Sequence, residues 1–261
     1  MFVWGPGGNG KSVFLNVIAE ILGDYAKQAA METFMASTGD RHPTELAALM
    51  GARLVLANEV EEGRRWNESR LKSLTGGDPV STRFMRGDFF TFTPQFKLLL
   101  VGNHKPALRN VDEAVRRRFH LIPFIHQPKV VDQDLPEKLK EEYPAILAWM
   151  LEGCRMWQED GLNAPESVRA ATETYFDEED AMGRWISECT VEHEDVTAGE
   201  VLYASWKDWC LRTGEYAGTS KRFGHMLTSR GFKRGRESTG QRQRGFAGID
   251  VRGLNAAPSF P

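Results

Sequence analysis

The chain contains 261 residues, of which 41% are apolar and 26% are charged, and its net charge is −3. These values are ordinary for a globular protein with a sizeable core, and they exclude collagenous, mucin-like and largely disordered proteins. The longest uninterrupted apolar runs, such as residues 98–101, have the length of a strand, so we predict no membrane span. The sequence also starts without the pattern of a secretory signal, and we expect a cytoplasmic location.

Charges and cysteines are unevenly distributed along the chain. Residues 221–252 are rich in Lys and Arg, so the remainder is acidic. A basic segment of this kind is typical of contact with nucleic acid, whereas the acidic net charge argues against a wholly basic coat protein. Cys154, Cys189 and Cys210 lack the spacing of metal ligands or redox pairs, and we expect them to be reduced and buried.

The first half of the chain shows the pattern of an α/β fold. Short apolar runs of strand length alternate with stretches in which apolar residues recur at helical spacing. Two of the runs, 54–57 and 96–101, are continuously apolar, as in strands buried on both faces of a parallel sheet. The predicted elements are strands at 2–4, 54–57, 89–93 and 96–101, and helices at 11–22 and 43–50.

Beyond residue 124 the pattern becomes helical. Apolar residues from 146 to 157 recur at the spacing of an amphipathic helix. Acidic residues between 177 and 195 then precede the basic C-terminal part, in which two predicted helices and a Gly/Arg/Gln-rich ribbon favour a winged helix. The predicted domains are an α/β core at 1–128, a helical extension at 129–195 and a winged-helix-like basic domain at 196–261.

A phosphate-binding pattern lies between the first strand and the first helix. Residues 5–12 match G-x-x-x-x-G-K-[ST], in which glycines turn backbone N–H groups toward a triphosphate. We expect Lys11 to reach the β- and γ-phosphates of ATP, and the Ser12 hydroxyl to bind Mg²⁺. A fortuitous glycine-rich turn is the alternative, and the flanking elements argue against it. The predicted nucleotide-binding residues are Gly5, Pro6, Gly7, Gly8, Asn9, Gly10, Lys11 and Ser12.

Hydrolysis of the nucleotide needs an acid at the end of a neighbouring strand. The predicted strand at 54–57 is followed by Asn58 and Glu59. With Asn58 in the position that orients magnesium, Glu59 is placed near the metal, where a general base polarises the attacking water. Glu61 and Glu62 are rivals for this role. The other interpretation is that these acids only decorate the strand end.

Two further groups are candidates for the reaction. Asn103 follows the strand at 96–101 and is a candidate sensor of the γ-phosphate, although Asn after Gly is also a common turn residue. Three consecutive arginines at 116–118 precede a short apolar run, so we expect at least one to be held rigidly. A rigid arginine that reaches the γ-phosphate of the next subunit is an arginine finger, and Arg118 and Arg117 are the candidates.

The order of these motifs resembles superfamily 3 helicases, and more closely the C-terminal helicase part of phage and plasmid primase-helicases. The resemblance covers residues 1 to about 192. It implies an AAA+ P-loop NTPase core, ATP and Mg²⁺ as cofactors, and a hexameric ring that pulls single-stranded DNA through its pore. The segments that carry it are the phosphate loop, Glu59, Leu-Lys-Ser-Leu-Thr-Gly-Gly-Asp at 71–78, Phe-Lys-Leu at 96–98, Asn-His-Lys-Pro at 103–106 and Arg117-Arg118 with Pro123-Phe124.

Two departures from the family pattern affect what is expected. Family members carry a helical collar and often a primase before the phosphate loop, whereas this sequence begins about four residues before it. We therefore expect a fragment or a split gene, with a primase domain or subunit upstream, and autonomous hexamer assembly is in doubt. Asn58 also stands where many ring ATPases have Asp, so magnesium must rely more on Ser12, phosphates and water.

The resemblance also implies two DNA contacts. Residues 80–90 correspond to a hairpin that lines the pore, where Arg86 and secondarily Arg83 are expected to meet single-stranded phosphates; an ordinary hairpin with exposed arginines is the alternative. In the tail, Trp206, Trp209, Phe223 and Leu227 are predicted to be core residues. The candidates for duplex contact are Lys221, Arg222, Arg234, Arg236, Arg242 and Arg244, with a solvated tail as the alternative.

The leading hypothesis is therefore an ATP-dependent DNA helicase module that acts in replication, in the host cytosol if it is phage-encoded. An ATP-switched module that marks an origin or recruits a polymerase without unwinding is the alternative. A small-molecule kinase shares the phosphate loop, but the residues around Leu74–Asp78 and Arg118 fit it poorly.

Overall fold

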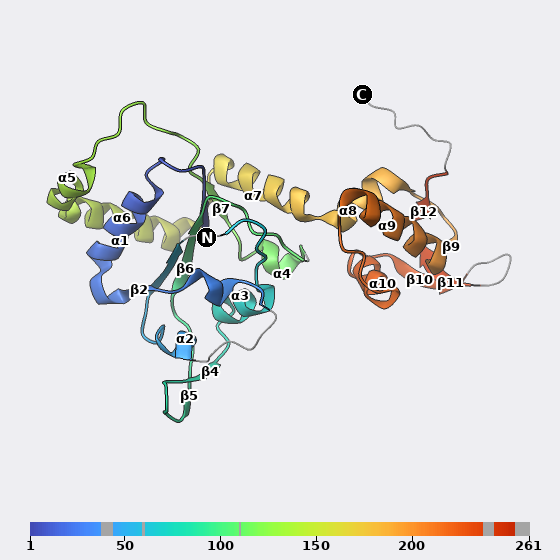
Figure 1. The fold of residues 1–261 in the computed structure, drawn as a ribbon, viewed down its shortest axis with the longest axis horizontal. Helices are drawn as coiled ribbons and strands as arrows, with labels where there is room; N and C mark the ends of the chain where they lie inside the picture. Colours follow the sequence, from blue (N-terminus) through green and yellow to red (C-terminus); the bar gives the residue numbers. More distant parts are fainter. Residues whose placement is uncertain (38–43, 59–60, 110, 237–242, 254–261) are drawn as a thin grey trace. The chain divides into compact units, whose positions relative to one another are not determined.

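The computed structural model describes the chain apart from residues 38–43, 59–60, 110, 237–242 and 254–261. It divides into two compact units, Met1–Glu179 and Asp180–Pro261 (Figure 1). The second unit thus begins at Asp180, within the acidic stretch and before the boundary predicted at residue 196. Residues 129–179, most of the predicted helical extension, belong to the same unit as the α/β core.

A parallel sheet forms the centre of the first unit. Its strands lie side by side in the order β2, β3, β6, β1, β7, and every adjacent pair is parallel. The fold is therefore mixed α/β with a parallel sheet, as predicted. The strands are β1 (Phe2–Trp4), β2 (Ala26–Gln28), β3 (Leu54–Asn58), β6 (Lys97–Gly102) and β7 (Leu121–Pro123).

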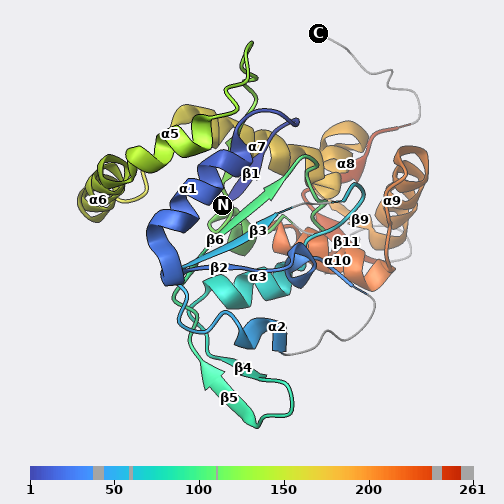
Figure 2. The same ribbon diagram turned by 60° about the vertical axis from the view of Figure 1, so that its left-hand side comes forward.

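Alternate residues of the strands bury opposite faces of the sheet, because side chains alternate along a strand. Val3, Leu56 and Leu99 pack with Leu15 of α1 (Lys11–Leu22) on one face. The opposite-facing residues of the same strands, among them Phe2, Val55 and Leu98, pack with Leu74 of α3 (Glu68–Thr75) on the other. Figure 2 shows α1 and α3 on the two sides of the sheet.

Of the remaining helices of the first unit, α7 contributes Tyr175 and Phe176 to the core, whereas α6 is peripheral. α6 includes the apolar positions expected of an amphipathic helix, but none of its residues is buried, and Trp149 is 65% exposed. Cys154 on this helix is also exposed, so the prediction of a buried thiol was wrong at that position. The elements are η1 (Gly23–Tyr25), η2 (Met31–Phe34), α2 (Thr44–Ala47), α4 (Glu113–Arg116), α5 (Leu135–Glu141), α6 (Tyr143–Asp160) and α7 (Glu166–Glu179).

The second unit has its own hydrophobic core. Trp206, Trp209, Phe223 and Leu227 are buried in it, as predicted, together with Trp185. Strands β10, β11 and β9 form an antiparallel sheet in that order, and β12 pairs with β8. The elements are α8 (Ala181–Cys189), β8 (Thr190–Val191), β9 (Val196–Ala198), α9 (Gly199–Thr213), α10 (Ser220–Ser229), β10 (Lys233–Arg236), β11 (Arg244–Ala247) and β12 (Asp250–Val251).

No helix in the described ranges of either unit combines the length and apolar character needed to cross a membrane.

Candidate nucleotide site and nucleic-acid interface

The strand register brings the predicted nucleotide residues to one edge of the sheet. Trp4, the last residue of β1, lies opposite Gly102 of β6 and Pro123 of β7. Asn58 at the end of β3 lies opposite Val101 of β6. The phosphate loop, Asn58 and Asn103 therefore follow neighbouring strand ends at the carboxyl edge, where ligands bind in open α/β sheets.

The phosphate loop has the backbone that anion binding requires. Gly8 and Gly10 have φ values of 74° and 81°, which side-chain-bearing residues rarely adopt, and Gly10 directly precedes α1. A Cβ added at Gly7, Gly8 or Gly10 would meet no atom within 4 Å, so the space in front of the loop is open. An open glycine loop at the N-terminus of a helix fits a phosphate chain.

Lys11 is held inside this loop by neutral oxygens. Its Nζ donates to the carbonyl oxygens of Gly5 (2.7 Å) and Pro6 (3.0 Å) and to Oδ1 of Asn9 (2.9 Å). The residue is 7% exposed, and burial lowers the pKa of its ammonium group. Because none of its three acceptors carries a charge, the ammonium is solvated by the loop but not neutralised, which suits a ligand with negative charge.

The loop is also tied to the segment that follows β7, a contact that the motif did not predict. Asn9 Nδ2 donates to the carbonyl oxygen of Phe124, and Gln127 Nε2 donates to that of Gly7 (2.8 Å). A Cβ at Gly5 would collide with the same Phe124 carbonyl, so glycine is required there. These contacts hold the loop against the segment that follows β7. The sequence offered no local signal for them, because the partners are more than a hundred positions apart.

The residues predicted to serve hydrolysis lie only partly within the described chain. Ser12 and Asn58 are exposed near the loop, which leaves their oxygen atoms accessible to a magnesium ion. Glu59 lies outside the described residues; its rivals Glu61 and Glu62 are exposed. Among the described residues there is no cluster of three acidic, His or Cys side chains able to hold a metal.

Asn103 is held by a hydrogen bond from a tryptophan side chain, which the sequence did not predict. Its backbone oxygen accepts a hydrogen bond from Trp4 Nε1 (3.1 Å), while its side chain is exposed at the carboxyl edge. Lys105 Nζ lies 4.7 Å from the centre of the Trp4 ring and forms an ion pair with Glu178 of α7 (2.9 Å). The residue before the glycine loop therefore positions the loop that carries Asn103.

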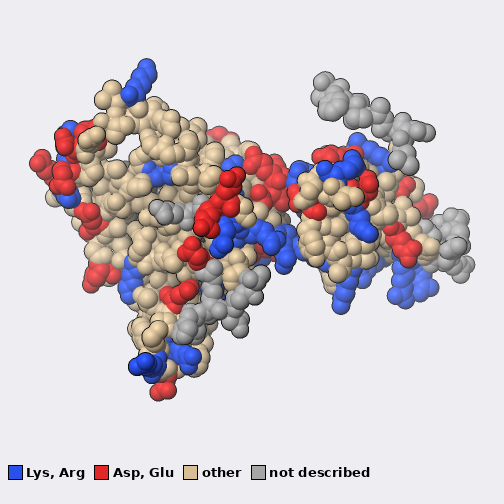
Figure 3. All heavy atoms as spheres, in the orientation of Figure 1, with Lys and Arg blue, Asp and Glu red and all other residues tan. Residues whose placement is uncertain are grey.

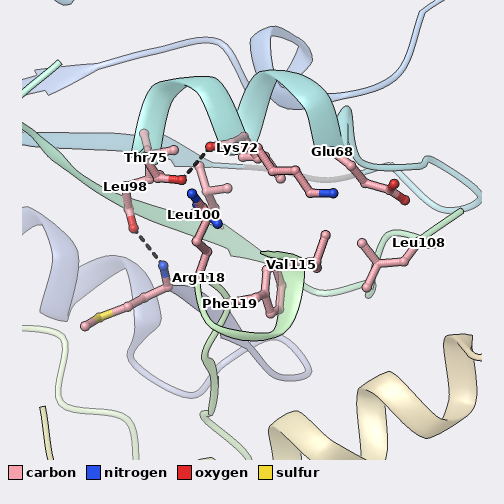
Figure 4. Close-up of a pocket in the computed structure, with 11 residues that line it drawn as sticks. Glu68, Lys72, Thr75, Leu98, Leu100, Leu108, Val115, Arg118 and Phe119 are labelled. Atoms are coloured by element: carbon pink, nitrogen blue, oxygen red, sulfur yellow. Dashed lines mark hydrogen bonds between the residues drawn. The ribbon is translucent and has the colours of Figure 1, made fainter. Parts of the chain in front are cut away.

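The predicted arginine fingers lie at the opposite edge of the sheet, because they precede β7 rather than follow it. Arg118 is half-buried and its Nη1 donates to the Ala114 carbonyl oxygen (2.9 Å). It lines a small cavity of about 40 Å³ below α3 (Figure 4). Arg117 is exposed, and Arg116 pairs with Glu173 (2.8 Å). The structure thus brings neither Arg117 nor Arg118 to the phosphate loop of its own chain.

Residues 80–92 form the predicted hairpin. β4 (Val80–Arg83) pairs antiparallel with β5 (Phe89–Phe92), and Arg86 lies in the turn with a φ of 60°. Arg83 stacks over the Phe89 ring, 4.9 Å from its centre, and that ring is 63% exposed. Figure 3 shows charged side chains at the end of this hairpin. Its tip thus presents cations and aromatic surface together.

Five of the six predicted tail residues lie on α10, β10 and β11 of the second unit; the sixth, Arg242, lies outside the described residues. Arg234 is exposed, but its guanidinium lies against α10, with Nε 3.4 Å from Thr228 Oγ1 and the ring of Phe246 5.8 Å away. Arg222 is half-buried; Lys221, Arg236 and Arg244 are exposed. Basic side chains gather on the side of this unit that carries α10 and the β10–β11 strands (Figure 3).

Comparisons with known proteins add the following similarities. A model of a family of unknown function, DUF5906, matches residues 3–118. Three viral relatives are each named as a putative helicase. The protein of Acanthamoeba polyphaga mimivirus is 27% identical over 229 residues, that of Frog virus 3 (isolate Goorha) 29% over 236 residues, and that of Invertebrate iridescent virus 3 31% over 151 residues.

The matches cover 78%, 80% and 54% of this chain, but only 24%, 24% and 16% of the respective relatives. The chain thus spans about a quarter of the length of the first two. Among solved structures, the A-form apo structure of the NrS-1 C-terminal region (305–718) is similar with a TM-score of 0.46 at 10% identity, covering 89% of this chain and 54% of that one. Over most of its length, this chain is similar to viral proteins named as putative helicases.

Proposed function

We propose that this chain is the ATP-hydrolysing module of a DNA helicase that acts in replication. The observation that carries the proposal is the buried, unneutralised ammonium of Lys11 inside an open glycine loop, at the sheet edge where Asn58 and Asn103 also lie. Such an arrangement suits a nucleoside triphosphate. The similarity to viral proteins named as putative helicases supports DNA unwinding as the process that ATP hydrolysis drives.

In the proposed reaction, water attacks the γ-phosphorus, the bond to the β–γ bridging oxygen breaks, and ADP and phosphate leave. Lys11 and the N-terminus of α1 stabilise charge on the phosphates, and Asn103 orients the water. Glu59 accepts the proton that the water loses. Bound Mg²⁺, held by Ser12 and the phosphates with Asn58 nearby, would neutralise charge on the phosphate oxygens.

We propose that the chain assembles into a hexameric ring with single-stranded DNA in its pore. Arg117 is exposed and lies away from its own phosphate loop, which supports a role toward the nucleotide of a neighbouring subunit, whereas Arg118 is half-buried and bonded within its own chain. Arg83 and Arg86 on the hairpin would contact the phosphates of single-stranded DNA. The second unit would act as a winged-helix domain whose basic side contacts duplex DNA. A primase partner and action in the host cytosol belong to the same proposal.

Steady-state ATP hydrolysis with and without single-stranded DNA, together with strand displacement on a forked duplex, tests this function. We expect DNA to stimulate hydrolysis and ATP to drive displacement. Glu59→Gln should retain nucleotide binding and lose hydrolysis; full turnover would move the base to Glu61 or Glu62. Nucleotide-dependent DNA binding without displacement would favour an ATP-switched recruitment module instead.

A further inference from the structure

The C-terminal turns of α7 are bonded to both loops that carry the proposed hydrolysis residues. The Tyr175 hydroxyl accepts a hydrogen bond from Trp66 Nε1 (3.0 Å) and donates one to the Pro106 carbonyl oxygen. Pro106 lies three residues after Asn103, and Trp66 follows the segment that begins after Asn58. One hydroxyl on a helix outside the sheet therefore joins the loop after β6 to the segment after β3.

The same two loops are also paired with each other at this point. The Trp66 backbone N–H donates to the Ala107 carbonyl oxygen (3.1 Å), and the Ala107 N–H donates to that of Arg64 (2.9 Å). One residue further, the Leu108 N–H donates to Glu179 Oε2 of α7 (2.7 Å). The Tyr175 hydroxyl thus lies at the junction of two loops, one of which carries Asn103 and the other Glu61 and Glu62.

The side chains that meet at this junction are buried. Tyr175 is 0% exposed and Trp66 is 3% exposed. The Tyr175 ring packs against Phe119 and Phe176, with ring centres 5.4 and 5.9 Å apart. Burial raises the pKa of the phenol, which keeps it protonated and able to donate. Without this hydroxyl, a buried indole N–H and a buried carbonyl would each lose a partner.

We propose that Tyr175 is a positioning residue for ATP hydrolysis, which sets the Asn103 loop against the segment that carries Glu61 and Glu62. The proposal rests on the proposed function. It separates hydrolysis from binding, because the hydrogen bonds of the phosphate loop itself to Phe124 and Gln127 do not involve Tyr175. Loss of the hydroxyl should therefore displace the reacting groups while the loop keeps its affinity for nucleotide.

Tyr175→Phe in the full chain tests this, with Tyr203→Phe as the matched control. Tyr203 is also a packed tyrosine that donates one hydrogen bond to a carbonyl, that of Gly218 (2.7 Å), but it lies in the second unit. We expect Tyr175→Phe to lower kcat about tenfold or more, since small misplacements of reacting groups cost that much. The Kd for a fluorescent ATP analogue should stay within about twofold, and Tyr203→Phe should match the parent protein in both.

A double-mutant cycle with Trp66→Phe distinguishes positioning from general loosening of the fold. If Tyr175 acts through Trp66, the double variant should have the kcat of Tyr175→Phe alone. Independent, multiplicative losses, or an unchanged kcat in Tyr175→Phe, would overturn the proposal while leaving the proposed function intact. A parent protein that binds nucleotide but never hydrolyses it would remove the proposed function and this role together.

Discussion

At the scale of single residues, the site is organised around one charge. Burying an ammonium group costs several kcal/mol unless it is hydrogen-bonded, and the three loop oxygens around Lys11 offset part of that cost. They do so without a counter-ion. The loop therefore stores a positive potential that a triphosphate can neutralise, and Asn9, which bridges Lys11 and Phe124, keeps the charge in place.

Lys11→Ala should abolish nucleotide binding while leaving the fold intact. The substitution removes the charge aimed at the phosphates, and it also removes the cost of desolvating that charge, so we expect a stability change below about 1 kcal/mol. Titration with a fluorescent ATP analogue and thermal unfolding measure the two effects. Retained binding at parental affinity would mean that the backbone of the loop suffices.

Arg117 and Arg118 should differ in what their removal does. Arg117 is exposed and free to reach a neighbour, whereas Arg118 is half-buried against α4 and below α3. Mixing Arg117→Ala with Lys11→Ala protein should restore some hydrolysis, because mixed interfaces pair an intact loop with an intact arginine. Arg118→Ala should chiefly lower the unfolding temperature. Failure of complementation in verified mixed assemblies would contradict a trans role for Arg117.

At the scale of elements, the β4–β5 hairpin, where we propose contact with DNA, is separate from the nucleotide site. Its turn carries Arg86 in the left-handed region beside an exposed aromatic surface, and no described residue of the nucleotide site belongs to it. A cation on such an element can follow successive phosphates without reading sequence.

Arg86→Ala should suppress strand displacement and the stimulation of hydrolysis by single-stranded DNA, while basal hydrolysis stays near the parental rate. Lys207→Ala on α9 is a suitable control, because it also removes an exposed cation, in the second unit. The ratio of DNA-stimulated to basal turnover is the measurement. Normal stimulation in Arg86→Ala would make the hairpin an ordinary surface element.

At the scale of the whole molecule, the two units have separate cores. The two hydrophobic clusters around the sheet contain buried residues up to Phe176, whereas the buried residues in the core of the second unit start at Met182. All proposed nucleotide-contacting residues belong to the first unit. A change on the surface of the second unit should therefore alter DNA affinity without altering basal hydrolysis.

Joint replacement of Lys221 and Arg236 by alanine should weaken duplex binding and flatten its salt dependence. Each lost phosphate contact lowers the slope of log K against log salt by about 0.9, so two lost contacts predict a change of about 1.8. Both side chains are exposed on the basic side of the unit. An unchanged slope in binding titrations from low to moderate salt would identify this side as a solvated surface.

Local sequence predicted some of the elements, because their causes are local, but it did not predict others, such as β2, β7 and α3. The helix at Lys11–Leu22, the buried strands and the glycine conformations follow from periodicity and from residues within a few positions of one another. The buried Trp206 and Phe223 followed from the same reasoning. The same pattern predicted the helix at 146–157, which is present as α6 (Tyr143–Asp160), although none of its residues is buried.

Tertiary structure alone decided how these parts are joined. Three contacts depend on which residues meet in the folded chain: the bond from Asn9 to Phe124, the bond from Arg118 to Ala114, and the bond from Trp66 to Tyr175. Trp66 and Tyr175 are 109 positions apart. Periodicity records which face of an element is buried, but not which distant hydrogen-bond donor meets which acceptor. For that reason the sequence predicted the chemical groups of the site, and the packed sheet and α7 determined their relative placement.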